Sequence, residues 1–325
     1  MTDETRMRRA IELGTSVRRT TSPNPWVGCV VEGLDGRRYE GVTSPPGGPH
    51  AEASALAAAG DAARGATLYV TLEPCCHQGR TPPCVEAIAA AGVRRVVVAL
   101  EDPDTRMQGR GVRRLREAGV EVAVGVCREE AADQLAPYVK HRTSGRPWVV
   151  LMLAAGFDGR TAAPDGTSRW ITGAEARADV HRLRAESDAV LVGAGTVKAD
   201  DPELTVRLVE GRDPLRVVLG SAPPGAKVQP ALELSGDLGA VLDHLGRLGV
   251  VQLLVEGGPT VAGAFHRARL VDRYVLYLAP ALFGGDDGRP LLAGPGAATL
   301  SDVWRGRIVS TERLGGDLRV ELAAP

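Results

Sequence analysis

The chain has 325 residues, of which 44% are hydrophobic and 24% are charged; this is typical of a globular protein with more than one domain and excludes a disordered or fibrous chain. The formal net charge is -1, which gives no bulk electrostatic support to binding of nucleic acid or of a membrane surface. No window approaches the roughly 18 consecutive apolar residues of a membrane-spanning helix, and the charged N-terminus lacks a secretory signal. We therefore expect a cytoplasmic protein, in which five cysteines spread over a long chain do not form a disulfide framework.

The first half of the sequence alternates segments that are typical of helices and strands. A hairpin is expected over residues 27–42, with its turn at Asp35-Gly36. Helices are expected over residues 3–14, 50–60, 84–92, 111–119 and 128–141. Strands are expected over residues 67–72, 94–100 and 120–126. Strands separated by helices predict an α/β layer with mostly parallel pairing.

A polar, turn-prone stretch over residues 140–147 interrupts this alternation and predicts a boundary between domains 1–145 and 146–325. Beyond it the α/β pattern restarts. Strands are expected over residues 148–156, 188–195, 215–220, 251–258 and 271–280, helices over residues 174–187 and 237–249, and a closing hairpin over residues 307–325.

Histidine, glutamate and cysteine residues in the first half have the spacing of a zinc site. His50 and Glu52 stand two apart at the start of an expected helix, and Cys75 follows a strand and a proline. Cys84 opens a helix, where the backbone N–H groups and the helix dipole stabilise a thiolate. One histidine and two thiolates leave a fourth position of a zinc ion open for water, which is typical of a catalytic site. The signature H-x-E followed by P-C-x-x-C is that of zinc deaminases, except that eight residues separate the two cysteines here.

Two other interpretations of the loop over residues 71–84 remain open. Its three cysteines and His77 could form a closed structural zinc site, or the cysteines could merely pack the loop. Neither interpretation explains why His50 and Glu52 precede the loop. We interpret Cys76 as a loop or pocket-wall residue, like His77, and Cys29 and Cys127 as small core residues in apolar strands.

Three stretches of the first half, residues 21–31, 49–56 and 71–122, closely resemble the deaminase half of the bifunctional riboflavin-biosynthesis deaminase–reductases. In that family the eight-residue gap between the cysteines is normal. The resemblance implies a cytidine-deaminase-like three-layer domain that removes the exocyclic amine from a pyrimidine bearing a phosphoribosylamino group. It further implies the zinc ligands His50, Cys75 and Cys84, a proton shuttle at Glu52, and pocket-lining residues Asn24 and Arg80.

The second half carries weaker signals of its own. Residues 254–261 read as a strand that runs through a glycine pair into a helix, a candidate phosphate or cofactor turn without the full G-x-G-x-x-G spacing. Residues 191–207 place Thr196, Asp200 and Arg207 on one long loop after a strand, where ligand-binding residues tend to collect. For Arg184, the sequence supports a surface salt bridge as well as it supports a role in ligand binding.

Residues 153–162, 168–177, 183–207, 253–265 and 270–285 resemble the reductase half of the same family, whose fold is similar to dihydrofolate reductase. The resemblance implies NADPH-dependent hydride transfer to the sugar C1′, which opens the ribose to a ribityl chain, and a homo-oligomer formed through this domain. By the same resemblance, the NADPH-binding residues are Ala154, Trp170, Thr196 and Asp200. The substrate-binding residues are Ser168, Arg184, Leu204, Arg207 and Glu256.

The sequence departs from the family pattern at several positions. Met152 replaces a lysine that contacts the reductase substrate, and the segment over residues 220–250 is short. Thr43 replaces a histidine near the deaminase pocket, and Cys76 and Gln78 are atypical of the zinc loop. These departures leave an alternative open, namely a specialised deaminase of a related aminopyrimidine nucleotide whose second domain is an inactive scaffold.

Overall fold

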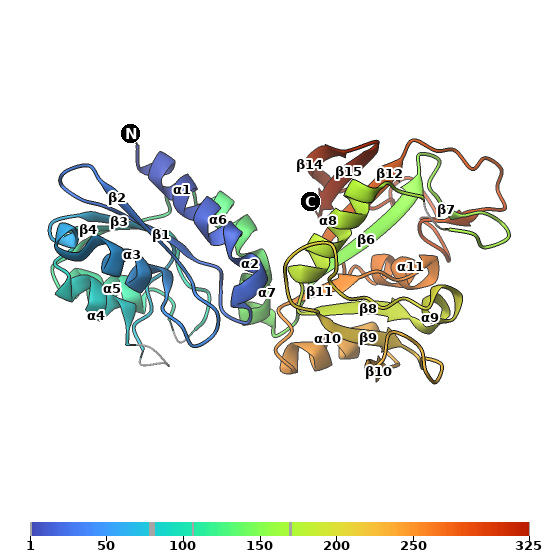
Figure 1. The fold of residues 1–325 in the computed structure, drawn as a ribbon, viewed down its shortest axis with the longest axis horizontal. Helices are drawn as coiled ribbons and strands as arrows, with labels where there is room; N and C mark the ends of the chain where they lie inside the picture. Colours follow the sequence, from blue (N-terminus) through green and yellow to red (C-terminus); the bar gives the residue numbers. More distant parts are fainter. Residues whose placement is uncertain (1, 78–81, 106, 169–170, 325) are drawn as a thin grey trace. The chain divides into compact units, whose positions relative to one another are not determined.

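The computed structural model describes residues 2–77, 82–105, 107–168 and 171–324 (Figure 1). The chain folds into two compact units, Met1–Gly145 and Arg146–Pro325. Among the described residues, no helix has both the length and the apolar composition needed to cross a membrane.

The first unit is a five-stranded sheet between two layers of helices (Figure 1). Its strands are β1 (Gly28–Glu32), β2 (Arg38–Val42), β3 (Thr67–Leu72), β4 (Arg95–Leu100) and β5 (Glu121–Val124), in the order β2-β1-β3-β4-β5. Its helices are α1 (Asp3–Ser16), α2 (Arg18–Thr21), α3 (Ala51–Ala59), the 3-10 turn η1 (Gly60–Ala63), α4 (Cys84–Ala90), α5 (Arg110–Glu117), α6 (Arg128–Gln134) and α7 (Ala136–Ser144). Helices α1 and α6 pack together against the sheet, and α3, α4 and α5 form the other layer.

Strand pairing in the first unit is only half parallel, which differs from the expectation of mostly parallel pairing. The predicted hairpin forms, so β1 and β2 are antiparallel, and β1 is also antiparallel to β3. Strands β3, β4 and β5 are parallel, because a helix separates each from the next.

Helix α1 lies unusually close to strand β1 because glycines occupy the contact. A Cβ at Gly28 would overlap the carbonyl oxygen of Ala10 and would lie 2.7 Å from the backbone nitrogen of Gly14. The absence of a side chain at Gly28 therefore sets the distance between this helix and the sheet.

The second unit is built on an eight-stranded sheet in the order β10-β9-β8-β11-β6-β12-β15-β14. Its strands are β6 (Trp148–Gly156), β7 (Arg160–Ala162), β8 (Ala189–Gly193), β9 (Leu215–Leu219), β10 (Leu232–Leu234), β11 (Gln252–Val255), β12 (Arg273–Ala279), β13 (Arg289–Pro290), β14 (Arg307–Leu314) and β15 (Asp317–Ala323). Its helices are α8 (Ala174–Ala185), α9 (Ala194–Asp200), α10 (Leu238–Arg247) and α11 (Pro259–Arg267). The first six strands in this order, from β10 through β9, β8, β11 and β6 to β12, pair in parallel. Strand β15 of the closing hairpin then pairs antiparallel with β12 and with β14.

The short segment over residues 220–250 still completes one edge of this sheet. Strand β10 pairs in parallel with β9. Helix α10 then begins at Leu238, and the carboxylate of its N-cap residue Asp237 accepts a hydrogen bond of 2.9 Å from the backbone N–H of Ala240.

Three local expectations from the sequence are wrong. The polar stretch over residues 140–147 is not a turn, since α7 continues to Ser144 and ends at Gly145, whose φ of 71° is left-handed. The single helix expected over residues 128–141 is two helices, because Pro137 lacks the N–H that would continue α6. Cys127 does not lie in a strand; it precedes α6 with a left-handed φ of 54°.

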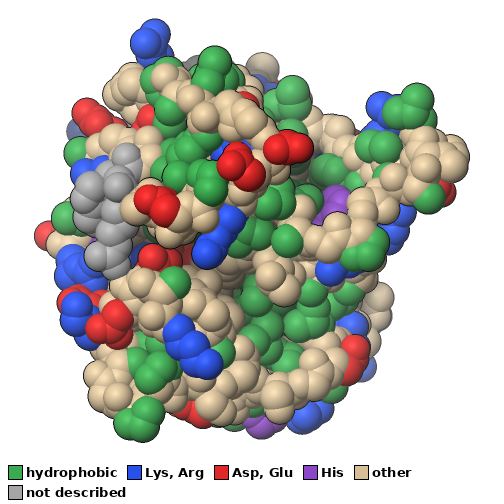
Figure 2. Space-filling view, turned by 90° about the vertical axis from the view of Figure 1, so that its right-hand side faces the viewer, with side chains coloured by type: hydrophobic (Ala, Val, Ile, Leu, Met, Phe, Trp, Pro, Cys, Tyr) green, Lys and Arg blue, Asp and Glu red, His purple; other side chains and the backbone are tan. Residues whose placement is uncertain are grey.

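Charged side chains of both signs are interspersed over the face drawn in Figure 2. Among the side chains coloured there, neither the basic nor the acidic ones gather into one continuous area. This distribution agrees with the net charge of -1.

Candidate active sites

His50, Cys75 and Cys84 converge in the first unit. Their ligand atoms all lie within 4.8 Å of one another, and His50 Nδ1 is 3.5 Å from Cys75 Sγ and 3.3 Å from Cys84 Sγ. His50 directly precedes α3, Cys75 follows β3, and Cys84 begins α4. One imidazole and two thiols in this arrangement fit a tetrahedral zinc ion with a fourth position available.

The two thiols are not equivalent. The backbone N–H of Cys84 donates a hydrogen bond of 3.3 Å to Cys75 Sγ. Hydrogen bonding from Cys84, followed by that from His50, lowers the pKa of Cys75. The thiol of Cys75 is thereby prepared to act as a thiolate, the form that binds metal.

Glu52 lies beside these ligands, in the first turn of α3. It is 4% exposed, and burial raises its pKa to about 7. A buried carboxyl group that can hold a proton near neutrality is suited to proton transfer.

A cavity of about 440 Å³ opens onto this cluster. Its walls include His50, Glu52 and Cys75, together with Asn24, as the sequence predicts. Thr43 also lines the cavity, and its hydroxyl accepts a hydrogen bond of 3.1 Å from the backbone N–H of Val27. This hydrogen bond fixes the hydroxyl of Thr43 to the backbone next to strand β1.

The two remaining loop residues have different surroundings. Cys76 is buried, with its Sγ 3.8 Å from Met107 Sδ, whereas His77 lines the cavity. The interpretation of His77 as a pocket-wall residue agrees with this structure; Cys76 instead belongs to the core. Neither residue is in the group of possible metal ligands, so the described residues do not support a closed zinc site within the loop.

Glu73 holds the loop that follows β4 against the zinc loop, a role that the sequence analysis missed. Its carboxylate accepts four backbone hydrogen bonds, two at Oε2 from Asp102 (3.1 Å) and Gly109 (3.0 Å), and two at Oε1 from Gly111 (2.7 Å) and Val112 (3.1 Å). The side chain is 4% exposed. Two of its donors lie in the first turn of α5, where the helix dipole also favours an anion.

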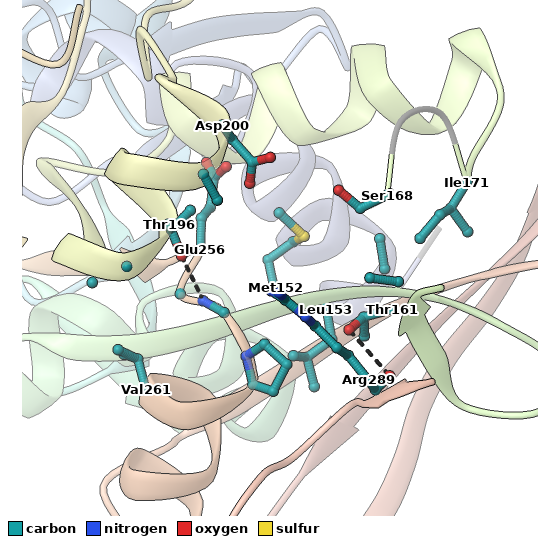
Figure 3. Close-up of a pocket in the computed structure, with 18 of the residues that line it drawn as sticks. Met152, Leu153, Thr161, Ser168, Ile171, Thr196, Asp200, Glu256, Val261 and Arg289 are labelled. Atoms are coloured by element: carbon teal, nitrogen blue, oxygen red, sulfur yellow. Dashed lines mark hydrogen bonds between the residues drawn. The ribbon is translucent and has the colours of Figure 1, made fainter. Parts of the chain in front are cut away.

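The second unit has a larger cavity, of about 880 Å³ (Figure 3). Strand β6, helices α8 and α9, and the turn from β11 into α11 all contribute to its walls. The predicted site residues that line it are Ala154, Ser168, Arg184, Thr196, Asp200, Arg207 and Glu256. Met152 lines it as well, and its side chain extends from β6 toward the space between Asp200 and Ser168 (Figure 3).

The structure differs from the sequence analysis at two points of this cavity. Thr196 and Asp200 lie on helix α9 rather than on a long loop. Leu204 does not line the cavity; its side chain is 2% exposed and packs in the core, and its φ of 55° is left-handed. The predicted residues Arg80 and Trp170, and the atypical Gln78, lie outside the described residues.

Arg184 forms a buried ion pair, not a surface one. Its Nε and Nη2 each donate a hydrogen bond of 2.7 Å to the carboxylate of Glu256, and its Nη1 donates one of 3.1 Å to the carbonyl oxygen of Thr205. The two side chains are 11% and 7% exposed. This pair joins α8, the turn after β11 and the segment that leads to Arg207.

His181 is a second residue that the sequence analysis missed. Its Nδ1 accepts a hydrogen bond of 2.9 Å from the backbone N–H of Arg207, which places the proton of the neutral imidazole on Nε2. Burial, and then the charges of Arg184 and Arg207, lower the pKa of His181. The neutral ring thus fixes the backbone position of Arg207 in the cavity wall.

Comparisons with known proteins cover both units. The sequence model of the cytidine and deoxycytidylate deaminase zinc-binding region matches residues 1–100, and that of the RibD C-terminal domain matches residues 147–320. The riboflavin biosynthesis protein RibD of Escherichia coli is 39% identical, with 99% of each chain covered. The chain belongs to the RibD family. The RibD protein of Mycobacterium tuberculosis is 43% identical, over 97% of this chain and 95% of its own.

Solved RibD structures resemble the whole chain. An Acinetobacter baumannii RibD structure has a TM-score of 0.92 and 38% identity, with 99% of each chain covered. A Thermotoga maritima structure, described as a diaminohydroxyphosphoribosylaminopyrimidine deaminase/5-amino-6-(5-phosphoribosylamino)uracil reductase, has a TM-score of 0.89 and 35% identity, with the same coverage.

These matches confirm the predicted family, the deaminase-like and reductase-like folds and the two cofactors of the family, zinc and NADPH. The protein is a RibD deaminase–reductase of riboflavin biosynthesis, with a zinc-binding deaminase region followed by a reductase region.

Proposed function

We propose that the first unit removes an amine from an aminopyrimidine that carries a phosphoribosylamino group, and that the second unit reduces the ribosyl group of the product to ribityl. The observation that carries the first step is the convergence of His50, Cys75 and Cys84 beside Glu52 in one cavity. The resemblance to the Thermotoga maritima protein supports the choice of substrate.

In the deamination, His50, Cys75 and Cys84 would hold zinc. Zinc bound there would supply an acidified water near the substrate. Glu52 accepts a proton at its carboxylate and delivers it to the departing amine, and its burial keeps bulk water away from this transfer. Asn24 and Arg80 position the pyrimidine.

In the reduction, NADPH would supply a hydride when bound. Thr196 and Asp200 on α9, together with Ala154 and Trp170, hold the cofactor, while Ser168 and Arg207 contact the substrate. The side chain of Arg184 already makes three hydrogen bonds within the protein, so its part and that of Glu256 are to organise the cavity wall. Leu204 contributes through its backbone conformation rather than through its side chain.

The experiment that tests the deaminase site compares zinc content and ammonia release. We expect Cys75→Ala to lose zinc and activity together, and Glu52→Gln to keep zinc while releasing no ammonia. The matched control is Cys76→Ala in the same loop, which should retain zinc. If Cys75→Ala keeps its zinc, the assigned ligand set is wrong; if Glu52→Gln still releases ammonia at the wild-type rate, the assigned proton shuttle is wrong.

We further infer, from the resemblance to the family, that the protein works in the cytoplasm as a homo-oligomer formed through the second unit. Light scattering on the full chain tests the oligomeric state, and a monomeric mass would contradict it.

A further inference from the structure

The deaminase cavity has an excess of acidic side chains among the described residues that line it. Four of these lining residues carry a carboxyl group, namely Glu52, Glu73, Asp102 and Asp104. The lining residues that the structure describes include a single arginine, Arg142, and no lysine. A phosphate-bearing substrate would be repelled by such a wall unless a cation binds its phosphate group.

Arg142 is held at the cavity by an aromatic ring. Its guanidinium carbon lies 5.1 Å from the centroid of the Tyr138 ring, within the range of a cation–π contact. The two residues are four apart on α7 and so share one face of this helix. Arg142 is exposed, so that its guanidinium is accessible to a ligand.

Tyr138 is itself fixed in place. Its hydroxyl donates to the carboxylate of Asp102, with distances of 3.3 and 3.2 Å to the two oxygens. Tyr138 is 6% exposed and Asp102 is 7% exposed. The bond holds the ring in place, so that the guanidinium above it is preorganised, which lowers the entropic cost of binding an anion.

We propose that Arg142 binds the phosphate group of the deaminase substrate, with Tyr138 as the residue that positions it. This inference rests on the proposed function of the first unit, since it assigns part of the substrate of that same site. A planar guanidinium with several N–H donors is suited to bidentate contact with phosphate oxygens. Arg142 and Tyr138 both lie on α7, which follows the zinc ligands by more than one strand and helix in the sequence.

The test compares the aminopyrimidine phosphate with its dephosphorylated form, through ammonia release by the full-length zinc-loaded enzyme. Loss of a hydrogen bond to a charged group lowers kcat/KM by about tenfold or more. We expect Arg142→Ala to show this loss for the phosphorylated substrate, through KM, and no change for the dephosphorylated one. Inorganic phosphate should also inhibit the wild type more strongly than this variant, with the dephosphorylated substrate as the reporter.

Two further variants separate the local contact from general charge effects. Arg128→Ala removes the same charge from an exposed position on α6 that does not line the cavity, and it should leave both substrates unchanged. Arg142→Lys keeps the charge but not the planar fork, and its kcat/KM for the phosphorylated substrate should lie between those of Arg142→Ala and the wild type.

The outcomes distinguish this inference from the proposed function. Equal effects of Arg142→Ala on both substrates, or no effect on either, would overturn the role of Arg142 alone. Absence of ammonia release by the wild type from both substrates would overturn the proposed function, and the inference with it.

Discussion

Replacing Glu73 by glutamine should destabilise the first unit strongly, although the change removes no carbon atom. Each carboxylate oxygen of Glu73 accepts two backbone N–H groups. A glutamine amide can satisfy one of these pairs with its oxygen, but its NH2 group faces the other pair as a donor. Two buried N–H groups are then unpaired, at a cost of about 1–3 kcal/mol each. We therefore expect the free energy of unfolding to fall by about 2–6 kcal/mol.

Hydrogen exchange of peptides from β3 and β4, followed by mass spectrometry in increasing urea, measures the opening of the first unit separately from that of the second. Glu117→Gln is a matched control, because Glu117 is exposed in the last turn of the same helix that Glu73 caps. Neutralising a carboxylate at that end should change the free energy of unfolding by less than about 0.5 kcal/mol. If Glu73→Gln behaves like Glu117→Gln, the four hydrogen bonds do not stabilise the unit as argued.

Three further predictions concern packing, pH and the reductase cavity. Gly28→Ala should destabilise the first unit by at least about 1–3 kcal/mol, because its Cβ would overlap the backbone of Ala10; an unchanged melting temperature would contradict the close packing of α1 on β1. The hydrogen bond from Arg95 lowers the pKa of Asp3, so Asp3 stabilises the fold above its unfolded pKa of about 4, and this stabilisation is lost as the pH falls through the lower folded value. The urea midpoint of Asp3→Asn should accordingly lie below that of the wild type at neutral pH, and the two should converge in acid; a gap that is constant with pH would exclude a charged contribution. Met152→Lys should raise the NADPH-dependent kcat/KM, because a lysine would place a cation in the cavity between Asp200 and Ser168; an unchanged value would mean that other residues already supply this contact.

The group of possible zinc ligands was predictable because residue types and their spacing in the sequence indicate this chemistry. His50 and Cys84 stand at the starts of helices and Cys75 lies in the loop after β3, and the structure brings the three together from those positions. Apolar runs in the sequence also predicted the buried strands. The bounds of β3 and β4 agree with the expected segments to within one residue.

What the sequence did not predict depends on tertiary contacts between distant elements. Tyr138 falls within an expected helix, whereas Arg142 lies in the stretch over residues 140–147 that the sequence predicts to be a turn. Only the packing of α7 places both side chains at the deaminase cavity. Glu73 has no distinctive spacing, because its partners are backbone N–H groups that any residue can provide. The sequence predicts a loop in place of helix α9 because this helix is short and contains Gly195, a residue with low helix propensity.

The product masses formed from the aminopyrimidine phosphate, with and without NADPH, test the account most directly. We expect the wild-type protein to exchange the amine for a carbonyl oxygen without NADPH, and to add two hydrogens to that product only when NADPH is present. Recovery of unchanged substrate under both conditions would contradict the account. Exchange of the amine with no reduction at any NADPH concentration would instead show that the second unit serves as a scaffold.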